Sequence, residues 1–256
     1  TTTTDSSGQY HFDVVAGDYR VRVVTDTVNS NRTGSNGSEL AVQTYRTDGT
    51  SGSAVAVTNH VGGERPEEAD AVANSGADSF ADLANASGYE IQSVSSISVS
   101  SASISGLDFG FNFNTIVNTN DSGQGSLRQF ILNSNLLANT NLEIENQTAG
   151  KDVSIFMISD GQAHAGLNTS YANLLTGTVG VDARAVVSLI TSLPNISAPD
   201  TVIDGSTQTT FVGNSNPGTL GLGGAASATV GVGADGLAGT GDELTITAFA
   251  RPELEI

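Results

Sequence analysis

Three acidic residues toward the carboxyl end are the first candidates for chemistry. Asp235, Asp242 and Glu243 lie in the glycine-rich stretch VGADGLAGTGDEL. Carboxylates and backbone carbonyls on a flexible loop are ligands that calcium accepts, so we interpret this stretch as a candidate calcium site. The alternating Asp/Asn ligands and the terminal Glu spacing of an EF-hand are missing, which leaves a solvated turn as the competing interpretation. Calcium is the one cofactor that the sequence indicates.

No arrangement of reactive side chains predicts catalysis. The chain contains no Cys, and therefore no thiol nucleophile. His11, His60 and His164 lie in separate regions, and such isolated residues predict neither a metal site nor a Ser/His/Asp triad. The acidic residues that could act in glycoside hydrolysis are scattered, and sequence does not reveal their separation in space. These are Asp152, Asp160, Asp182 and Asp204, together with Arg184. We predict no catalytic residue and no enzymatic activity.

Sequons provide candidate modification sites. The pattern N-x-S/T begins at seven positions, and a chain this rich in Ser and Thr produces several by chance. Two of them, Asn120 and Asn195, are less suitable because they fall in a predicted helix cap and a predicted coil. The candidates for glycosylation are Asn31, Asn36, Asn85, Asn146 and Asn168.

The charge balance excludes two classes of partner. The chain has 27 Asp and Glu residues against 9 Lys and Arg residues, and its formal net charge is −18. Nucleic acid binding requires a basic surface that releases counterions, and an anionic membrane would repel this chain. We therefore expect no nucleic acid partner. The composition suits a soluble protein of the cell exterior.

No targeting or membrane segment is evident in the sequence. No apolar run approaches the ~20 residues that span a bilayer, and no signal peptide is recognisable. The chain begins without Met and stops inside a predicted strand, so we expect it to be a piece of a longer polypeptide. The absence of Cys leaves secretion open, because many prokaryotic surface proteins have no disulfides.

One amphipathic helix, within residues 115–138, is the clearest predicted element. Ser126 is a suitable N-cap and Gln129 completes a capping box. The apolar residues fall at i, i+3 and i+4 spacing, while Asn133, Asn135 and Asn139 mark a polar face and a fraying end. We expect Arg128 either to pair with Asp121 or Asp204 or to be exposed. The predicted structural cap comprises Ser126, Leu127, Arg128, Gln129, Phe130 and Ile131.

The rest of the chain predicts strands separated by turns, and hence an all-β class. The clearest strand covers 106–114, where Leu107, Phe109, Phe111 and Phe113 share one face. A short helix could begin in 64–86, although an exposed loop with one helical turn fits equally well. Periodicity alone does not separate a solenoid from a sandwich. The other predicted strands cover 9–14, 19–23, 39–45, 54–58, 89–105, 153–158, 185–190, 201–203, 244–248 and 254–256.

The first of two resemblances concerns the amino-terminal stretch. GQYHFDVVAGDYRVRV resembles the last hairpin of the Cna-B-like and carboxypeptidase-regulatory-like sandwiches of bacterial surface proteins. We therefore assign 1–27 as the terminal hairpin of a β-sandwich and 28–114 as a strand-rich segment with a possible short helix. Some such sandwiches carry a Lys–Asn isopeptide bond, which this segment cannot form because it has no Lys.

The second resemblance covers 115–256. NTNDSGQGSLRQFILNSN (118–135) and SLPNISAPDTVIDGSTQ (192–208) resemble the start of the right-handed parallel β-helix region of large bacterial surface proteins. This implies a β-helix capped by one amphipathic helix and preceded by sandwich-like strands, with long insertions at 160–181 and 213–241. The helix would cover the apolar end of the first coil.

These resemblances imply a secreted or cell-surface protein with a structural or adhesive role. We expect a fibre subunit that associates with itself through β-strand edges into a homo-polymer. One alternative is a carbohydrate-binding adhesin that uses the loop aromatics Tyr171 and Phe211. Because some parallel β-helices are polysaccharide lyases or hydrolases, that activity is a further, weaker alternative.

Overall fold

The computed structural model describes residues 2–50, 52–68, 93–140, 142–144, 147–224 and 228–256. The regular secondary structure of this part of the chain is mainly strand, with two α-helices and one short 3-10 helix, η1 (Thr25–Thr27), so the predicted β-rich class is confirmed. The sheets are small and mixed in direction. None of the described helices is both long enough and apolar enough to cross a membrane.

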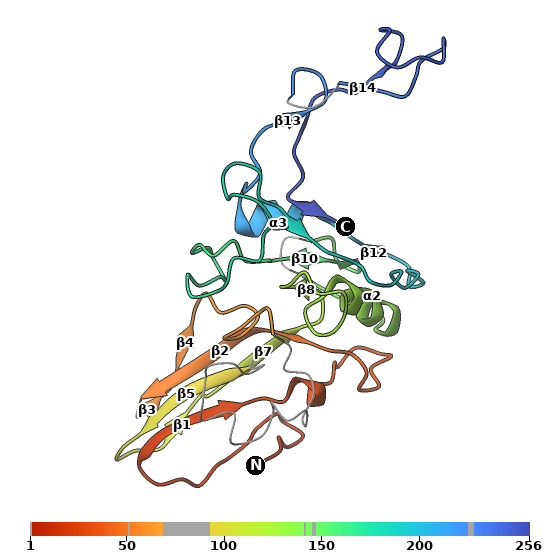
Figure 1. The fold of residues 1–256 in the computed structure, drawn as a ribbon. Coiled ribbons are helices and arrows are strands. Elements are labelled where there is room, and N and C mark those ends of the chain that lie inside the picture. Colours follow the sequence, from red (N-terminus) through yellow and green to blue (C-terminus); the bar gives the residue numbers. More distant parts are fainter. Residues whose placement is uncertain (1, 51, 69–92, 141, 145–146, 225–227) are drawn as a thin grey trace.

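A five-stranded sheet occupies the amino-terminal end of the molecule (Figure 1). It contains β1 (Gly17–Arg22), β5 (Val94–Val99), β2 (Val42–Thr50), β4 (Val55–Val57) and β7 (Phe109–Asn112). The order is β1-β5-β2-β4, and β7 also pairs with β2. β2 and β5 run parallel, whereas the other pairs are antiparallel. A small parallel pair, β3 (Gly52–Ser53) and β6 (Ile104–Ser105), lies beside this sheet.

The predicted amino-terminal hairpin is wrong. Residues 9–14 belong to no strand, and β1 pairs with β5, with Gly17 opposite Val99. Tyr10 instead donates from its hydroxyl to the carbonyl of Leu107 at 2.5 Å, and its ring meets Phe12 edge to face. Alternation identifies residues that suit a strand, but it does not identify the strand with which they pair. Here that partner is β5, which is distant in the sequence.

Three short parallel strand pairs follow the sheet and lie next to it (Figure 1). All of their strands except β8, which directly follows the predicted strand 106–114, fall within or overlap predicted strands, but each is only two residues long. The pairs are β8 (Thr115–Ile116) with β10 (Ile155–Phe156), β9 (Asp152–Val153) with β12 (Thr201–Val202), and β11 (Ala185–Val186) with β17 (Leu254–Glu255).

Two α-helices accompany these pairs. α2 (Leu127–Leu136) is the predicted helix, whereas α3 (Ser206–Val212) was not predicted. α3 is short and lacks an apolar repeat, and it begins where the Asp204 carboxylate accepts the N–H of Ser206 at 2.9 Å. The helix predicted in 64–86 lies mostly outside the described residues, and 64–68 contain only turns and a bend.

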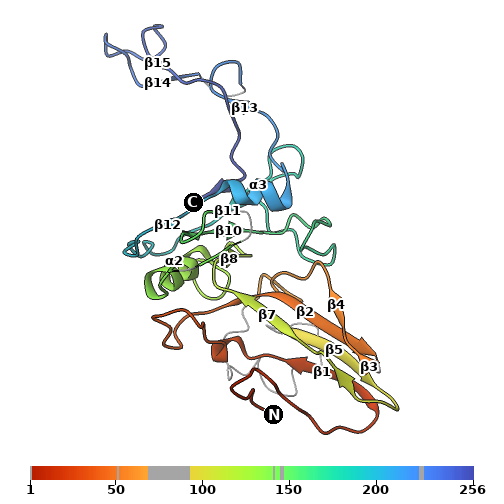
Figure 2. The ribbon, with the colours of Figure 1, turned by 180° about the vertical axis from the view of Figure 1, so that it is seen from behind.

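A long arm leaves the body between α3 and β17. It is built from two antiparallel pairs, β13 (Thr219–Leu220) with β16 (Phe249–Ala250) and β14 (Thr229–Val230) with β15 (Leu244–Thr245). Figures 1 and 2 show the arm projecting away from both helices. The strand predicted at 244–248 is therefore divided between β15 and the segment that leads into β16.

The main apolar core lies between α2 and the parallel pairs. The predicted cap residues Leu127, Phe130 and Ile131 are buried in it against Ile116 and Phe156. A second core joins segment 157–171 to α3, and its buried members are Met157, Leu167, Tyr171 and Val212.

Candidate functional site

Helix α2 begins where the sequence predicts, but its capping box is only half formed. The Ser126 hydroxyl accepts the N–H of Gln129 at 3.1 Å. The Gln129 side chain does not return to Ser126. Its Nε2 instead donates to Asn133 Oδ1 at 2.8 Å, because Asn133 is buried and requires a partner.

Arg128 anchors the first turn of α2. Its Nη2 lies 2.8 Å from Asp121 Oδ1, and its side chain is only 12% exposed, so it pairs with Asp121 and not with Asp204. Nη1 and Nη2 also donate at 2.7 Å to the carbonyls of Ser192 and Thr191 respectively. The hydrogen bond from Arg128, followed by the N–H of Ile190, lowers the pKa of the Asp121 carboxyl. Arg128 therefore ties the helix start to the 190–192 segment.

Asn133 and Asn135 in α2, and Asn139 just after it, were predicted to mark a polar face and a fraying end, but each is hydrogen-bonded to another segment. Asn133 is 3% exposed; its Oδ1 accepts the N–H of Leu40 at 3.1 Å, and its Nδ2 donates to the Leu40 carbonyl at 2.8 Å. Asn135 accepts the N–H of Ser197 at 2.7 Å, and Asn139 donates to the Pro199 carbonyl at 2.9 Å. α2 is thus bound to the sheet side by Asn133 and to the 195–199 segment by the other two.

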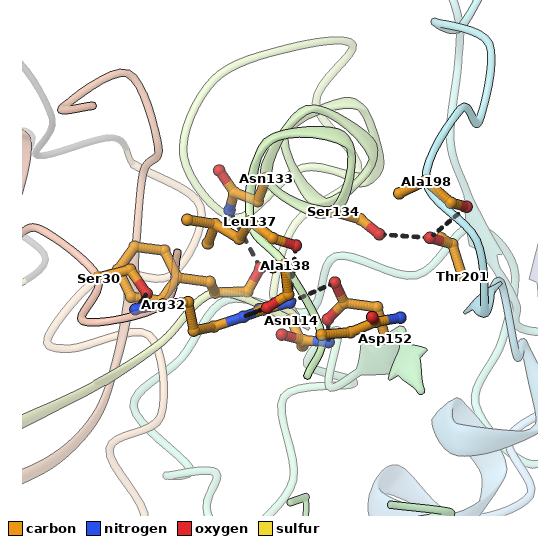
Figure 3. Close-up of polar contacts among 12 residues, drawn as sticks. Ser30, Arg32, Asn114, Asn133, Ser134, Leu137, Ala138, Asp152, Ala198 and Thr201 are labelled. Atoms are coloured by element: carbon orange, nitrogen blue, oxygen red, sulfur yellow. Dashed lines mark hydrogen bonds and ion pairs between the residues drawn. The ribbon is translucent and has the colours of Figure 1, made fainter. Parts of the chain in front are cut away.

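A buried ion pair holds the other end of α2 (Figure 3). Arg32 Nη2 lies 2.6 Å from Asp152 Oδ2, with side-chain exposures of 13% and 2%. Arg32 also donates to the carbonyls of Ala138 at 2.9 Å and Leu137 at 3.1 Å. Asn114 donates to Asp152 Oδ1 at 2.7 Å, so both carboxylate oxygens have a partner. We call this group of Arg32, Asn114 and Asp152 the junction.

The loop that carries Arg32 is shaped by one carboxylate. Glu39 Oε1 accepts the Ser30 N–H at 3.1 Å and the Ser35 hydroxyl, and Oε2 accepts the N–H groups of Asn36 at 3.2 Å and Gly37 at 2.9 Å. Burial alone would raise the pKa of Glu39, but these hydrogen bonds outweigh burial and lower the pKa to about 2. The charged form of Glu39 therefore organises the loop.

An open groove of about 400 Å³ lies beside the junction. Segment 28–32 forms one side, and residues 111–114 with Leu142 form the other. Its lining combines the rings of Phe111 and Phe113 with the side chains of Asn29, Asn31 and Asn112. The groove is therefore both apolar and rich in amide groups, with the Arg32 charge held at its edge by Asp152.

The edge of the 152–158 segment is completed by side chains. Asp152 and Ser154 donate their N–H groups to the carbonyls of Asp200 at 3.0 Å and Val202 at 2.9 Å. The same ladder continues from Phe156 to Thr207 Oγ1 and from Ile158 to Gln208 Oε1, both at 2.9 Å. The side-chain oxygens of Thr207 and Gln208 thus accept the hydrogen bonds that backbone carbonyls of a neighbouring strand would accept. Both residues end the 192–208 stretch that resembles the start of a β-helix region, but the sequence did not assign them this role.

A second polar cluster fastens the 160–171 loop to the sheet. Buried Arg46 forms ion pairs with Glu64 and, at 3.6 Å, with Asp48. Burial and then the Arg46 charge lower the pKa of His60, whose ring meets Tyr171 edge to face. Tyr171, 4% exposed, donates to the Gly63 carbonyl. Phe211, the second aromatic expected to contact sugar, lies in α3 and packs half-buried against the same core.

The carboxylates of the candidate calcium loop bind the loop's own amides. Asp242 Oδ2 accepts the N–H groups of Ala234 at 2.8 Å and Asp235 at 3.2 Å. Glu243 accepts those of Thr240 and Gly241, both at 2.9 Å. Hydrogen bonds lower the pKa of both carboxyls, with the Thr240 hydroxyl the main cause at Asp242 and backbone N–H groups at Glu243.

No group of three or more His, Asp or Glu side chains in the described part of the chain could hold a metal ion. Calcium at Asp235, Asp242 and Glu243 stays a prediction.

The scattered acidic residues have separate structural partners. Asp152 binds Arg32, Asp204 accepts the N–H of Ser206 at the start of α3, and Asp182 accepts the N–H of Thr178 at 2.8 Å. Asp160 lies 2.9 Å from His164 Nε2, and Arg184 pairs with Glu255.

The candidate glycosylation sites differ in exposure. Asn31 and Asn36 are exposed, whereas Asn168 is half-buried with its Nδ2 3.2 Å from His60 Nε2. Asn85 and Asn146 lie outside the described residues. Use of any of these sites stays a prediction.

Comparisons with known proteins gave no match to a family model, a curated protein or a solved structure. Function is therefore inferred from the geometry of the chain. The junction and the groove are the features that sequence reasoning missed, and nothing in the spacing of Arg32, Asn114 and Asp152 indicates that they meet.

Proposed function

We propose that the chain is an extracellular structural or adhesive protein, a secreted or cell-surface fibre subunit that acts without catalysis. We further propose that residues 115–256 begin a right-handed parallel β-helix with α2 as its cap. The observation that carries this proposal is the row of hydrogen bonds along 152–158. The N–H groups of Asp152 and Ser154 donate to backbone carbonyls of the 200–202 segment, and those of Phe156 and Ile158 donate to side-chain oxygens of α3.

The path of the chain through the parallel pairs supports the β-helix. Segment 114–116 pairs with 155–157, segment 152–154 with 200–202, and segment 185–187 with 253–255. Each pair joins one pass of the chain to the next in the same direction, as successive coils of a solenoid do. The 160–181 loop and the long arm leave the coils at equivalent places, before β11 and before β17.

The position of α2 supports its role as the cap. Its apolar face covers Ile116 and Phe156, and its polar residues bind the sheet on one side and the 190–201 segments on the other. A solenoid needs such a cover because its end exposes an apolar cross-section. The junction adds a buried ion pair at the boundary, which suits a rigid link between the sheet and the coils.

Unpaired strand edges supply a route to self-association. Among the described residues, β1 pairs only with β5, β4 only with β2, and β17 only with β11. Addition of a strand from a second copy to such an edge is head-to-tail and propagates into a filament. The net charge of −18 favours protein or neutral ligands over nucleic acid and anionic membranes.

The assembly is tested by sedimentation velocity over a wide concentration range together with negative-stain electron microscopy. We expect concentration-dependent growth into linear polymers whose association weakens when Ala56 in β4 is replaced by Pro, which removes a backbone donor that faces away from β2. A Ser53→Pro variant of β3 is the matched control for a proline introduced outside the five-stranded sheet. A monomer at every concentration, with single particles only, would contradict the filament.

A further inference from the structure

We propose that the groove between segment 28–32 and the end of β7 binds a neutral carbohydrate. The inference deepens the adhesive part of the proposed function, on which it rests, by naming a ligand class and a site. It does not require that the chain polymerise.

The lining of the groove has the two kinds of surface that sugars use. Phe111 and Phe113 line it with aromatic carbon, onto which the C–H face of a pyranose packs. Asn29 and Asn31 are exposed, and their side-chain amides have no protein hydrogen bond in the part of the chain that the structure describes. Asn112 Oδ1 accepts from Asn114 N at 2.6 Å and Thr115 Oγ1 at 3.1 Å, which leaves its Nδ2 as a donor. An amide both donates and accepts, as adjacent sugar hydroxyls require.

Charge favours a neutral ligand over an acidic one. Arg32 is the one charged residue of the lining, and Asp152 neutralises it at 2.6 Å. The formal charge of −18 on the whole chain repels uronic and sialic acids. The volume of about 400 Å³ lies in the usual range for ligand sites, roughly 300–1,000 Å³, and accommodates a short glycan.

Both walls of the groove are held in place before any ligand arrives. Four contacts from Glu39 fix the loop that carries Asn31, and Asp152 binds both Arg32 and Asn114. A site of this kind loses little conformational entropy on binding. The predicted sugar contact Tyr171 is buried in a core and Phe211 packs half-buried against that core, whereas Phe111 and Phe113 line the groove.

The test is a glycan array that presents glucose-, galactose-, mannose- and N-acetylglucosamine-terminated glycans together with uronic- and sialic-acid glycans, probed with the full chain. We expect binding among the neutral set. Calorimetric titration with each free neutral glycan then compares Asn31→Ala and Phe111→Ala with Asn214→Ala, a change at an exposed Asn outside the groove. Asn31→Ala should weaken binding by about tenfold and leave thermal melting unchanged, because that side chain has no partner to lose.

Three outcomes would overturn the inference: no neutral glycan bound, binding confined to acidic glycans, or full affinity retained by both groove variants. Phe111→Ala also affects packing, so Asn31→Ala decides the result if the Phe variant is unstable. Filaments without glycan binding would contradict this site alone, whereas glycan binding by a chain that stays monomeric would contradict the filament alone.

Discussion

The side-chain amide of Gln208 pairs with the peptide group of Ile158 on both of its polar atoms. Oε1 accepts the Ile158 N–H at 2.9 Å, and Nε2 donates to the Ile158 carbonyl at 2.7 Å. Both residues are buried. Asn133 forms the same two hydrogen bonds with the peptide group of Leu40. Two amide side chains therefore pair with backbone groups as a neighbouring strand would.

Replacing Gln208 by Leu should destabilise the chain by about 2–6 kcal/mol. The change leaves a buried N–H and a buried carbonyl without partners, and each such group costs about 1–3 kcal/mol. Urea unfolding followed by circular dichroism measures the effect. Gln162→Leu, at an exposed position whose side chain has no described hydrogen bond, is the matched control and should change stability by less than about 0.5 kcal/mol. Equal effects at both positions would contradict a structural role for the amide pair.

Replacing Arg32 by Ala should cost about 3–5 kcal/mol, because it leaves the Asp152 carboxylate buried and unpaired. The double variant Arg32→Met with Asp152→Leu should recover part of that loss, because it removes both charges. Arg184→Ala breaks the partly exposed pair with Glu255 and should cost at most about 1 kcal/mol. Denaturant titrations of the four proteins decide this, and a small loss for Arg32→Ala would show that the junction does not stabilise the boundary.

Glu39 should make stability depend on acid pH. Its pKa is about 2 in the folded chain against 4.5 as the ordinary value, so the folded state favours the charged form. The stabilisation is present above about pH 4.5 and is lost as the pH falls toward 2. Thermal melting of Glu39→Gln should show a weaker decline over this window than the parent chain. Glu143→Gln, at an exposed carboxylate, should follow the parent curve.

Gly34 should tolerate no side chain. It adopts φ +102°, and a Cβ there would lie 2.0 Å from the Leu136 carbonyl oxygen at the end of α2. Gly37 in the same loop has φ +86°, but a Cβ there meets nothing closer than Asn29 Oδ1 at 3.5 Å. Gly37→Ala should therefore cost only the backbone term of about 1–2 kcal/mol, and Gly34→Ala should cost more. Unfolding free energies that do not differ between the two would contradict the close approach of loop and helix.

The helix start and its apolar face were predictable, because Ser126, Leu127, Phe130 and Ile131 act through neighbours within one or two turns. The longer strands β1, β2, β5 and β7 were predictable as well, since alternation is local, whereas 9–14 forms no strand and β13 and β14 were not predicted. The partner of a strand was not: β1 satisfies the predicted alternation but pairs with β5, which follows it after a long intervening segment. α3 escaped prediction because its side chains complete a ladder on another segment, and no apolar repeat marks that role.

The sequence by itself determined a β-rich, acidic, cysteine-free chain with one amphipathic helix capped by Ser126. The tertiary structure alone decided that Arg32 meets Asp152 across 120 residues, that Asn133 is buried on Leu40, and that Phe111 and Phe113 border a groove with Asn31. The physical reason is range. Helix caps and hydrophobic periodicity depend on residues a few positions apart. A buried ion pair or a groove depends on how distant segments pack, and the spacing of residues along the sequence does not reveal that packing.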